Sequence, residues 1–290
     1  MPIATPLCLP AYLFLQNKKK SIIFALSFKK KRKGYINIKH KRRMIIKVCG
    51  LREEGNIRDV ENLGADLIGF DFRPGSERYV EMVSSNTGIM PDYSAERFNG
   101  GDCQGKENEN EVCTDGRISY SNASEQRTTK RSGTFADDMP QNIITRIYNY
   151  HLDYVQLNGN ESGTMIDNLR RTVDPDIRKG LKIIKTISIE KESDMDKWHE
   201  YKGHADLLLF DMKHTADGDY GGCTGWDMIE AYSGDIPFII GGIGMDDAHR
   251  IRGIRNPMLA GVNLDEGFEV SPGMKDTERL KRFIKELEKK

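Results

Sequence analysis

One repeating pattern constrains the fold of this chain more than any other feature. From residue 44 onward, a short apolar run is followed by a turn and then by a segment with apolar residues at helical spacing, about eight times over. The expected strands are 44–48, 66–72, 131–136, 154–157, 181–187, 205–210, 237–240 and 261–264. The expected helices are 53–63, one after the second strand, 141–150, 163–172, 193–201 with Ser193 as its N-cap, 227–232, 246–254 and 276–288.

Strands that are nearly continuous apolar runs are typical of a parallel sheet covered by helices, because both faces of such a strand are buried. Eight alternating units predict the α/β class and a single-domain (β/α)8 TIM barrel, which is the commonest way to use eight. A doubly wound open sheet is the structural alternative. No GxGxxG follows the first strand, which disfavours a dinucleotide-binding form of that sheet.

Polar residues stand where the predicted strands end. In a parallel barrel all carboxyl ends face one mouth, where ligands bind. We therefore expect one group of residues to face this mouth: Cys49, Arg78, Gln156, Asp211, Gly241, Gly242 and Asn263.

Two of these residues can move protons. Cys49 closes the run MIIKVC and is either a small buried core residue or a reactive thiol. Asp211 closes the run LLLFD, so desolvation at the barrel rim would raise its pKa and favour a proton-donating form. A helix N-cap or a turn is the alternative role for this aspartate.

A glycine-rich loop follows the seventh predicted strand, with Gly241, Gly242 and Gly244 in the sequence GGIG. Such a loop presents bare backbone N–H groups to an anion, and barrels often hold a phosphate between the loops after strands seven and eight. Asp265 and Glu266 lie in the second of these loops. They suit a phosphate only through their backbone amides.

Six motifs in order carry a family resemblance: KVCG, GADLIGFDFRPGSERYV, YVQLNG, LLLFD with YGG downstream, PFIIGGIG, and AGVNLDEGFEVSPGMKD. On these motifs the chain resembles, from residue 44 to its C-terminus, the phosphoribosylanthranilate isomerase family of tryptophan biosynthesis. The resemblance implies an Amadori rearrangement of N-(5-phosphoribosyl)anthranilate to 1-(2-carboxyphenylamino)-1-deoxyribulose 5-phosphate, without cofactor or metal.

The resemblance also implies a role for each site residue. Cys49 would be the general base, Asp211 the general acid, and the planar fork of Arg78 would bind the anthranilate carboxylate. The remaining implied contacts are Gln156 and Asn263 to substrate, and Gly241, Gly242, Gly244, Asp265 and Glu266 to phosphate.

The chain departs from the family pattern at several positions. Members commonly have histidine at Asn158, aspartate at Asn263 and serine at Ile240, and the loop YGGCTGWDM from Tyr220 is one residue shorter than usual. A phosphosugar-binding relative without turnover is therefore an alternative. A barrel isomerase of a histidine-pathway aminoaldose is disfavoured, because that family uses two aspartates where Cys49 and Asp211 stand.

Two regions fall outside the resemblance. Residues 1–43 are expected to be a disordered basic leader, either from an upstream start or as an arm for nucleic acid or an anionic membrane; its apolar runs are too short to cross a bilayer. Residues 98–129 are polar and aperiodic, which predicts a disordered insert in the barrel of residues 44–290. Cys103 and Cys113 are too far apart for a metal knuckle.

Composition limits the partners. Lys plus Arg and Asp plus Glu each number 44, so with a basic leader the remaining domain is acidic, which argues against nucleic-acid binding. Five cysteines without paired spacing argue for a reducing compartment. We therefore expect a cytoplasmic monomer or homodimer that binds a small phosphosugar and no membrane.

Overall fold

The computed structural model describes residues 43–85, 88–91, 129–174, 176–212 and 225–289. Nearly all of the predicted leader and insert lie outside these residues, and so does most of the loop that begins at Tyr220. The domain boundaries at residues 43 and 98–129 therefore stay predictions.

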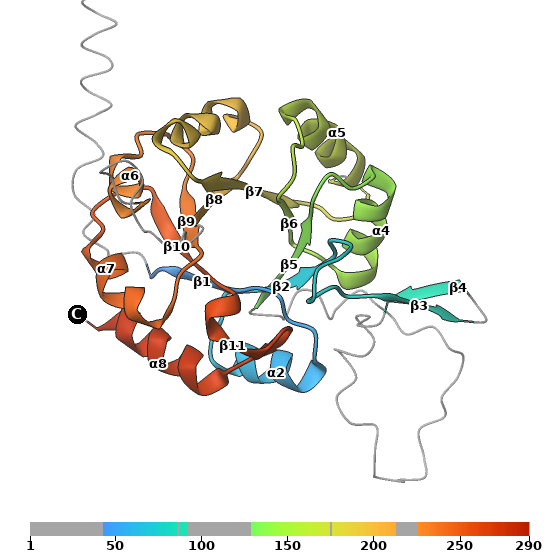
Figure 1. Ribbon diagram of the computed structural model, residues 1–290. Helices are drawn as coiled ribbons and strands as arrows, with labels where there is room; N and C mark the ends of the chain where they lie inside the picture. Colours follow the sequence, from blue (N-terminus) through green and yellow to red (C-terminus); the bar gives the residue numbers. More distant parts are fainter. Residues whose placement is uncertain (1–42, 86–87, 92–128, 175, 213–224, 290) are drawn as a thin grey trace, which may run out of the picture. The chain divides into compact units, whose positions relative to one another are not determined.

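Eight parallel strands close into a barrel in the order β1, β10, β9, β8, β7, β6, β5, β2 (Figure 1). This confirms the predicted (β/α)8 TIM barrel and excludes the open sheet. Each strand overlaps a predicted one, because the apolar runs are the strand interiors. The bounds are β1 Ile45–Val48, β2 Leu67–Asp71, β5 Lys130–Phe135, β6 Tyr154–Leu157, β7 Lys182–Ile189, β8 Leu207–Met212, β9 Phe238–Gly241 and β10 Leu259–Leu264.

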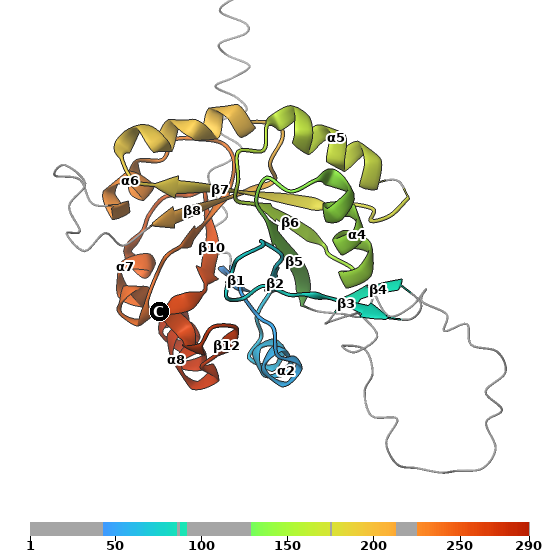
Figure 2. The same cartoon turned by 45° about the vertical axis from the view of Figure 1, so that its right-hand side comes forward.

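Helices lie outside the ring of strands in both views (Figure 2). Their bounds are α2 Glu54–Asn62, α4 Pro140–Tyr150, α5 Gly163–Val173, η1 Glu192–Tyr201, α6 Gly225–Ala231, η2 Met245–Asp247, α7 Ala248–Gly253 and α8 Thr277–Glu288. One face of each longer helix is buried against the strands. In α8 the buried residues are Leu280, Phe283, Ile284 and Leu287, which share one helix face.

One predicted helix differs in detail. Residues 192–201 form a 3-10 helix, η1, and the prediction that Ser193 is its N-cap was wrong. The carboxylate of Asp194 instead accepts hydrogen bonds from the backbone N–H groups of Glu190 and Lys191, each at 3.0 Å. The Asp194 carboxylate accepts both of these hydrogen bonds, and the hydroxyl of Ser193, one position earlier in the sequence, does not take this role.

Two short antiparallel hairpins were not expected. Strands β3 (Met82–Ser85) and β4 (Gly88–Pro91) pair after β2; the helix expected after β2 was given no bounds, and the residues from 92 to 128 lie outside those described. Strands β11 (Glu269–Ser271) and β12 (Met274–Lys275) pair after β10. Pro272 and Gly273, the latter with φ of +85°, make the tight turn between them.

The apolar core has two parts. A large cluster fills the layer between strands and helices, and a smaller one fills the barrel interior. The interior cluster contains Leu67, Ile184, Leu207, Leu209 and Ile239.

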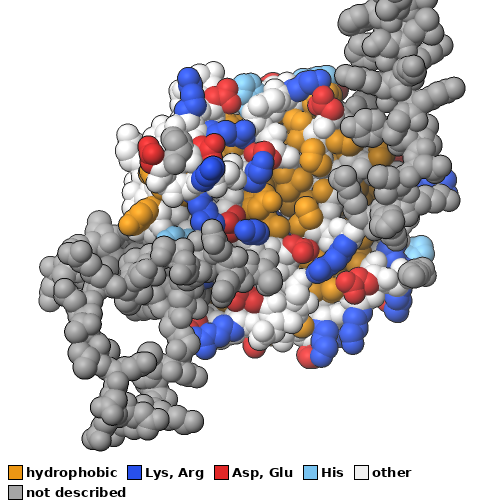
Figure 3. All heavy atoms as spheres, turned by 180° about the vertical axis from the view of Figure 1, so that it is seen from behind, with side chains coloured by type: hydrophobic (Ala, Val, Ile, Leu, Met, Phe, Trp, Pro, Cys, Tyr) orange, Lys and Arg blue, Asp and Glu red, His pale blue; other side chains and the backbone are white. Residues whose placement is uncertain are grey.

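Seen from behind, apolar side chains also gather near the middle of the molecular surface, with charged side chains around them (Figure 3). Within the described residues, no helix combines the length and apolar character needed to span a membrane.

Strands β10 and β1 approach each other closely at Gly261. A Cβ at this position would lie 2.1 Å from the carbonyl oxygen of Ile45. We expect Gly261→Ala to lower the free energy of unfolding by about 1–3 kcal/mol, measured by urea denaturation, because the strands must separate locally. In Gly55→Ala, on α2, the added Cβ meets nothing within 4 Å, so this control should gain up to about 1 kcal/mol. Equal stability of Gly261→Ala and the unmodified chain would contradict the prediction.

Candidate active site

The interior rows of the barrel change from apolar to polar as the strands reach their carboxyl ends. Side chains alternate between the two faces of a strand, so residues two apart share the interior face. Three such rows are Ile45, Lys47, Cys49 on β1; Leu67, Gly69, Asp71 on β2; and Leu207, Leu209, Asp211 on β8. The alternation that builds the apolar interior therefore also brings Cys49 and Asp211 to the same mouth.

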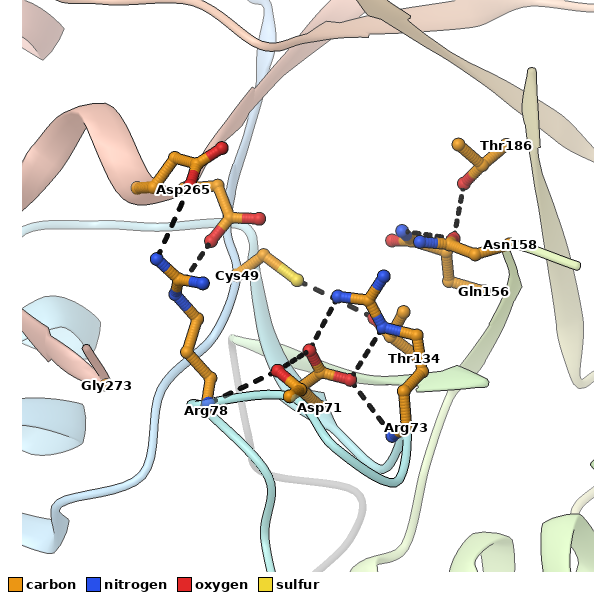
Figure 4. Close-up of polar contacts among 12 residues, drawn as sticks. Cys49, Asp71, Arg73, Arg78, Thr134, Gln156, Asn158, Thr186, Asp265 and Gly273 are labelled. Atoms are coloured by element: carbon orange, nitrogen blue, oxygen red, sulfur yellow. Dashed lines mark hydrogen bonds and ion pairs between the residues drawn. The ribbon is translucent and has the colours of Figure 1, made fainter. Parts of the chain in front are cut away.

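Cys49 lies directly after β1 and is 4% exposed. Its Sγ lies 3.6 Å from Thr134 Oγ1 on β5 (Figure 4). The strand between them, β2, has Gly69 beside the thiol, and a Cβ on Gly69 would lie 2.8 Å from Sγ. The missing side chain on β2 is what lets the thiol reach across to a polar partner.

Asp211 is the last interior residue of β8 and is partly exposed. Its register partners are Ser188 on β7 and Gly241 on β9. Gly242 has φ of +70°, and a Cβ there would lie 2.2 Å from Met212 O and 3.0 Å from Asp211 Oδ1. Only glycine fits this position, so the loop after β9 passes directly beside the carboxylate.

Arg78 packs against Gly50, the residue after Cys49, since its Cδ would lie 2.6 Å from a Cβ on this glycine. Its guanidinium already holds a carboxylate: Nε and Nη2 donate to Glu269 at 2.9 and 2.7 Å. The hydrogen bond with Glu269 is the largest of several influences that together raise the pKa of Arg78, although burial opposes them. Among the described residues, the carboxylates around this guanidinium contact Nε and Nη2, which leaves Nη1 as the edge of the fork that a ligand carboxylate can meet.

A charged cluster around Arg78 was missed in the sequence. The buried Lys275 Nζ lies 2.7 Å from Glu269 Oε1 and 3.4 Å from Asp265 Oδ1. Burial acts to raise the pKa of Glu269, but the hydrogen bonds and charges of Arg78 and Lys275 outweigh it and lower that pKa. The short β11–β12 hairpin brings Glu269 and Lys275 together, and it has no periodic signal in the sequence.

A second arginine, Arg73, was also missed. The buried Asp71 accepts from the backbone N, Nε and Nη2 of Arg73 at 3.0, 2.9 and 2.7 Å, and from Ser76 Oγ at 2.7 Å (Figure 4). Burial acts to raise the pKa of Asp71, but the hydrogen bonds and charge of Arg73, with Ser76, lower it. The pKa of Arg73 is raised, first by its hydrogen bond with Asp71, and the charge of Cys49 contributes. Arg73 is thus within electrostatic reach of the thiol.

A polar group lines the mouth at β6 and β7. Asn158 Oδ1 accepts from Gln156 Nε2 at 2.9 Å and from Thr186 Oγ1 at 2.6 Å. Gln156 is 3% exposed, and its Oε1 has no hydrogen-bond partner among the described residues. A buried acceptor without a partner is costly, so this oxygen is suited to a ligand hydroxyl.

The predicted phosphate-binding residues are only partly brought together. The loops after β9 and β10 touch, since a Cβ on Gly267 would lie 2.7 Å from Ile243 O. The N–H of Gly244, however, donates to Asp247 Oδ2 at 2.8 Å. The carboxylates of Asp265 and Glu266 lie 3.9 and 3.6 Å from Arg78. Their negative charges are attracted to the guanidinium of Arg78. Both side chains therefore belong, with Glu269 and Lys275, to the charged cluster around Arg78, called here the Arg78 cluster.

Two buried lysines complete the polar part of the barrel. Lys47 Nζ donates to Asn263 Oδ1 at 2.6 Å, between the register partners on β1 and β10. Lys185 Nζ lies 2.8 Å from Glu161 Oε2, and both side chains are 2% exposed. Lys47, Lys185 and Glu161 support the site and were not predicted from the sequence. Lys47 and Lys185 each stand inside an apolar strand, and this position is the sequence signal that could have identified them. Among the described residues, no group of three or more His, Cys, Asp or Glu side chains is arranged to hold a metal ion.

Comparison with known proteins shows which family the chain belongs to. The family model for N-(5'phosphoribosyl)anthranilate (PRA) isomerase matches residues 108–286. A relative from Parabacteroides distasonis, named N-(5'-phosphoribosyl)anthranilate isomerase, is 34% identical over 245 residues, which are 84% of this chain and 93% of the relative. The chain belongs to the N-(5'-phosphoribosyl)anthranilate isomerase family. A relative of the same name from Phocaeicola vulgatus is 31% identical and covers 85% of this chain and 99% of its own length.

Solved structures of this isomerase share the fold. The crystal structure from Thermotoga maritima has a TM-score of 0.58 at 24% identity, covering 84% of this chain and 98% of that one. A phosphoribosyl anthranilate isomerase in complex with reduced 1-(o-carboxyphenylamino)-1-deoxyribulose 5-phosphate has a TM-score of 0.57 at 21% identity and the same coverage. At these identities the likeness supports the barrel of the isomerase family.

The Arg78 cluster predicts a pH dependence of stability. The folded pKa of Glu269 lies below its usual 4.5, so its contribution is present above that value and is lost as pH falls through the folded pKa. We expect Glu269→Gln to lower the free energy of unfolding by about 3 kcal/mol near pH 7, because Arg78 and Lys275 lose their shared carboxylate. Urea denaturation as a function of pH should show this difference shrinking below about pH 4.5.

Glu278→Gln is the matched control. The Glu278 side chain is 76% exposed and lies 3.8 Å from Lys281, so its removal should change stability little at any pH. A difference for Glu269→Gln that stays constant down to pH 3 would show that the carboxylate charge is not what stabilises the cluster.

Proposed function

We propose that this chain catalyses the isomerisation of N-(5'-phosphoribosyl)anthranilate to 1-(2-carboxyphenylamino)-1-deoxyribulose 5-phosphate, a step of tryptophan biosynthesis. The observation that carries the proposal is the placement of Cys49 and Asp211 as the last interior residues on β1 and β8 of one barrel. A thiol and a carboxylate at one mouth are the two proton-moving groups that an aldose-to-ketose rearrangement requires. Family membership supports the substrate.

The first step opens the sugar ring. Asp211, in its protonated form, donates a proton to the furanose ring oxygen as the bond from that oxygen to C1′ breaks. The lone pair of the anthranilate nitrogen forms the C1′–N double bond, which gives a protonated imine. The position of Asp211 at the end of β8, with Gly241 and Gly242 leaving room beside it, supports this assignment.

The second step moves the C2′ hydrogen. The protonated imine makes this hydrogen acidic, and the thiolate of Cys49 removes it as the electron pair forms the C1′–C2′ double bond. The enolamine then takes a proton at C1′ and loses one from the C2′ hydroxyl, so that C1′ is reduced and C2′ oxidised with no net change in atoms. The position of Cys49 directly after β1, within electrostatic reach of Arg73, supports this assignment.

The remaining groups hold the substrate. Arg78, which packs against Gly50, is proposed to bind the anthranilate carboxylate, and Arg73, within electrostatic reach of Cys49, adds a second positive charge near it. Gln156 has a buried acceptor for a sugar hydroxyl. The backbone of the loops after β9 and β10, which meet at Ile243 and Gly267, supplies N–H groups for the phosphate.

A phosphosugar-binding relative without turnover remains the second candidate, favoured by Asn158 and Asn263 in place of the family's histidine and aspartate. Family membership, with both proton-moving residues in place, favours the isomerase. The chain is further proposed to act as a monomer or homodimer in the cytoplasm on a small phosphosugar, without nucleic acid. A relative from Thermotoga maritima is described as dimeric, which is compatible with this.

The decisive measurement follows the anthranilate fluorescence lost when freshly generated substrate is added. We expect rapid loss with the unmodified chain, and a fall in kcat of at least about 100-fold for Cys49→Ser and for Asp211→Asn, because each removes one proton-transfer group. Asp59→Asn, at an exposed position of α2, and Cys103→Ser are the matched controls. Both controls should keep full activity.

Binding separates the two candidate functions. Affinity for reduced 1-(o-carboxyphenylamino)-1-deoxyribulose 5-phosphate, measured by calorimetry, should be retained in Cys49→Ser. If the unmodified chain binds this compound but causes no fluorescence loss, the barrel is a phosphosugar-binding relative and the isomerase proposal is wrong.

A further inference from the structure

Lys47 and Asn263 form a buried polar pair inside the barrel. They are 0% and 4% exposed. The Lys47 ammonium donates a hydrogen bond to Asn263 Oδ1 at 2.6 Å. We infer that this pair is a positioning device: Lys47 fixes the amide of Asn263 so that an N–H donor, and not a negative charge, lies beside Asp211. The inference deepens the proposed function and rests on its assignment of Asp211 as the acid.

The orientation of the amide follows from the chemistry of its partner. An ammonium group carries only donors, so only the oxygen of the Asn263 amide can face Lys47. The oxygen and nitrogen of an amide lie on opposite sides of one planar group. Asn263 Nδ2 is therefore turned away from Lys47, and the exchange of O and N that is ambiguous for many amides is decided here.

Gly241 shows where Nδ2 lies. This residue ends β9, the strand between β10 and β8. A Cβ on Gly241 would lie 3.6 Å from Asn263 Nδ2 and 3.7 Å from Asp211 Oδ1. Both atoms thus border one small space, which is kept clear of side chain by the glycine. A ligand oxygen in that space meets a neutral N–H donor on one side and the carboxyl group on the other.

The identity of residue 263 then contributes to the charge around Asp211. An aspartate at this position would place a second carboxylate across the same space, and two neighbouring carboxylates hold one proton to higher pH. Asn263 supplies a hydrogen bond without that charge, so Asp211 is expected to release its proton at lower pH than it would beside an aspartate. Lys47 holds the neutral donor in place.

The test is a titration of the Asp211 carboxyl carbon by ¹³C NMR, with the resonance assigned through Asp211→Asn. We expect its midpoint to move to higher pH in Asn263→Asp, by roughly half a pH unit or more. In the double variant with Lys47→Met and Asn263→Asp the shift should be larger, because the cation no longer offsets the added charge. Asn62→Asp, at an exposed position of α2, is the control and should leave the midpoint unchanged.

A kinetic readout runs in parallel. The alkaline limb of the kcat/KM profile of Asn263→Asp should move to higher pH with the NMR midpoint, and Lys47→Met alone should raise KM because the Asn263 amide is no longer held in place. Circular dichroism at each pH verifies that the variants are folded. An unchanged Asp211 midpoint in folded Asn263→Asp overturns the inference. Absence of turnover in the unmodified chain overturns the proposed function instead, and the NMR titration still decides the inference.

Discussion

The closed ring of eight parallel strands is the constraint on which the rest of the structure depends. Closing the sheet gives every strand an inner face, and the two-residue alternation then determines which side chains enter the interior. The same rows that supply Leu207 and Leu209 to the interior cluster end in Asp211, and the row that begins with Ile45 ends in Cys49. The register of the strands therefore determines both the packing of the barrel interior and the position of the proton-moving side chains. A one-residue slip of a strand would turn its side chains to the opposite face and disrupt both.

This dependence explains why so much could be predicted from the sequence. The strand runs are apolar on both faces, so their limits are visible without any structure, and each polar residue that closes a run is placed at the mouth by the topology alone. Cys49 and Asp211 were found in this way. The helices were predicted less well where local side-chain contacts decide the geometry, as at η1, where Asp194 and not Ser193 accepts the free N–H groups.

The features that were missed are those that depend on contacts between distant segments. Glu269 and Lys275 lie nearly 200 residues beyond Arg78 in sequence, on a hairpin too short to show periodicity, yet Glu269 binds its guanidinium and Lys275 binds Glu269. Arg73 looks like a loop residue until the structure shows its bond to the buried Asp71. Lysines 47 and 185 stand in apolar strands, and only the partners Asn263 and Glu161 explain how their charges are accommodated.

Charged groups are distributed unevenly around the mouth. On the β1 and β2 side, Arg73 lies within electrostatic reach of the thiol and Arg78 packs against Gly50, so two guanidinium groups lie on the side where the substrate carboxylate is proposed to bind. On the β8 and β9 side, Asp211 borders the neutral amide of Asn263 and the glycines at 241 and 242. The proposed reaction uses this division, because the anthranilate carboxylate would be held on one side of the mouth while the furanose ring oxygen would be protonated on the other.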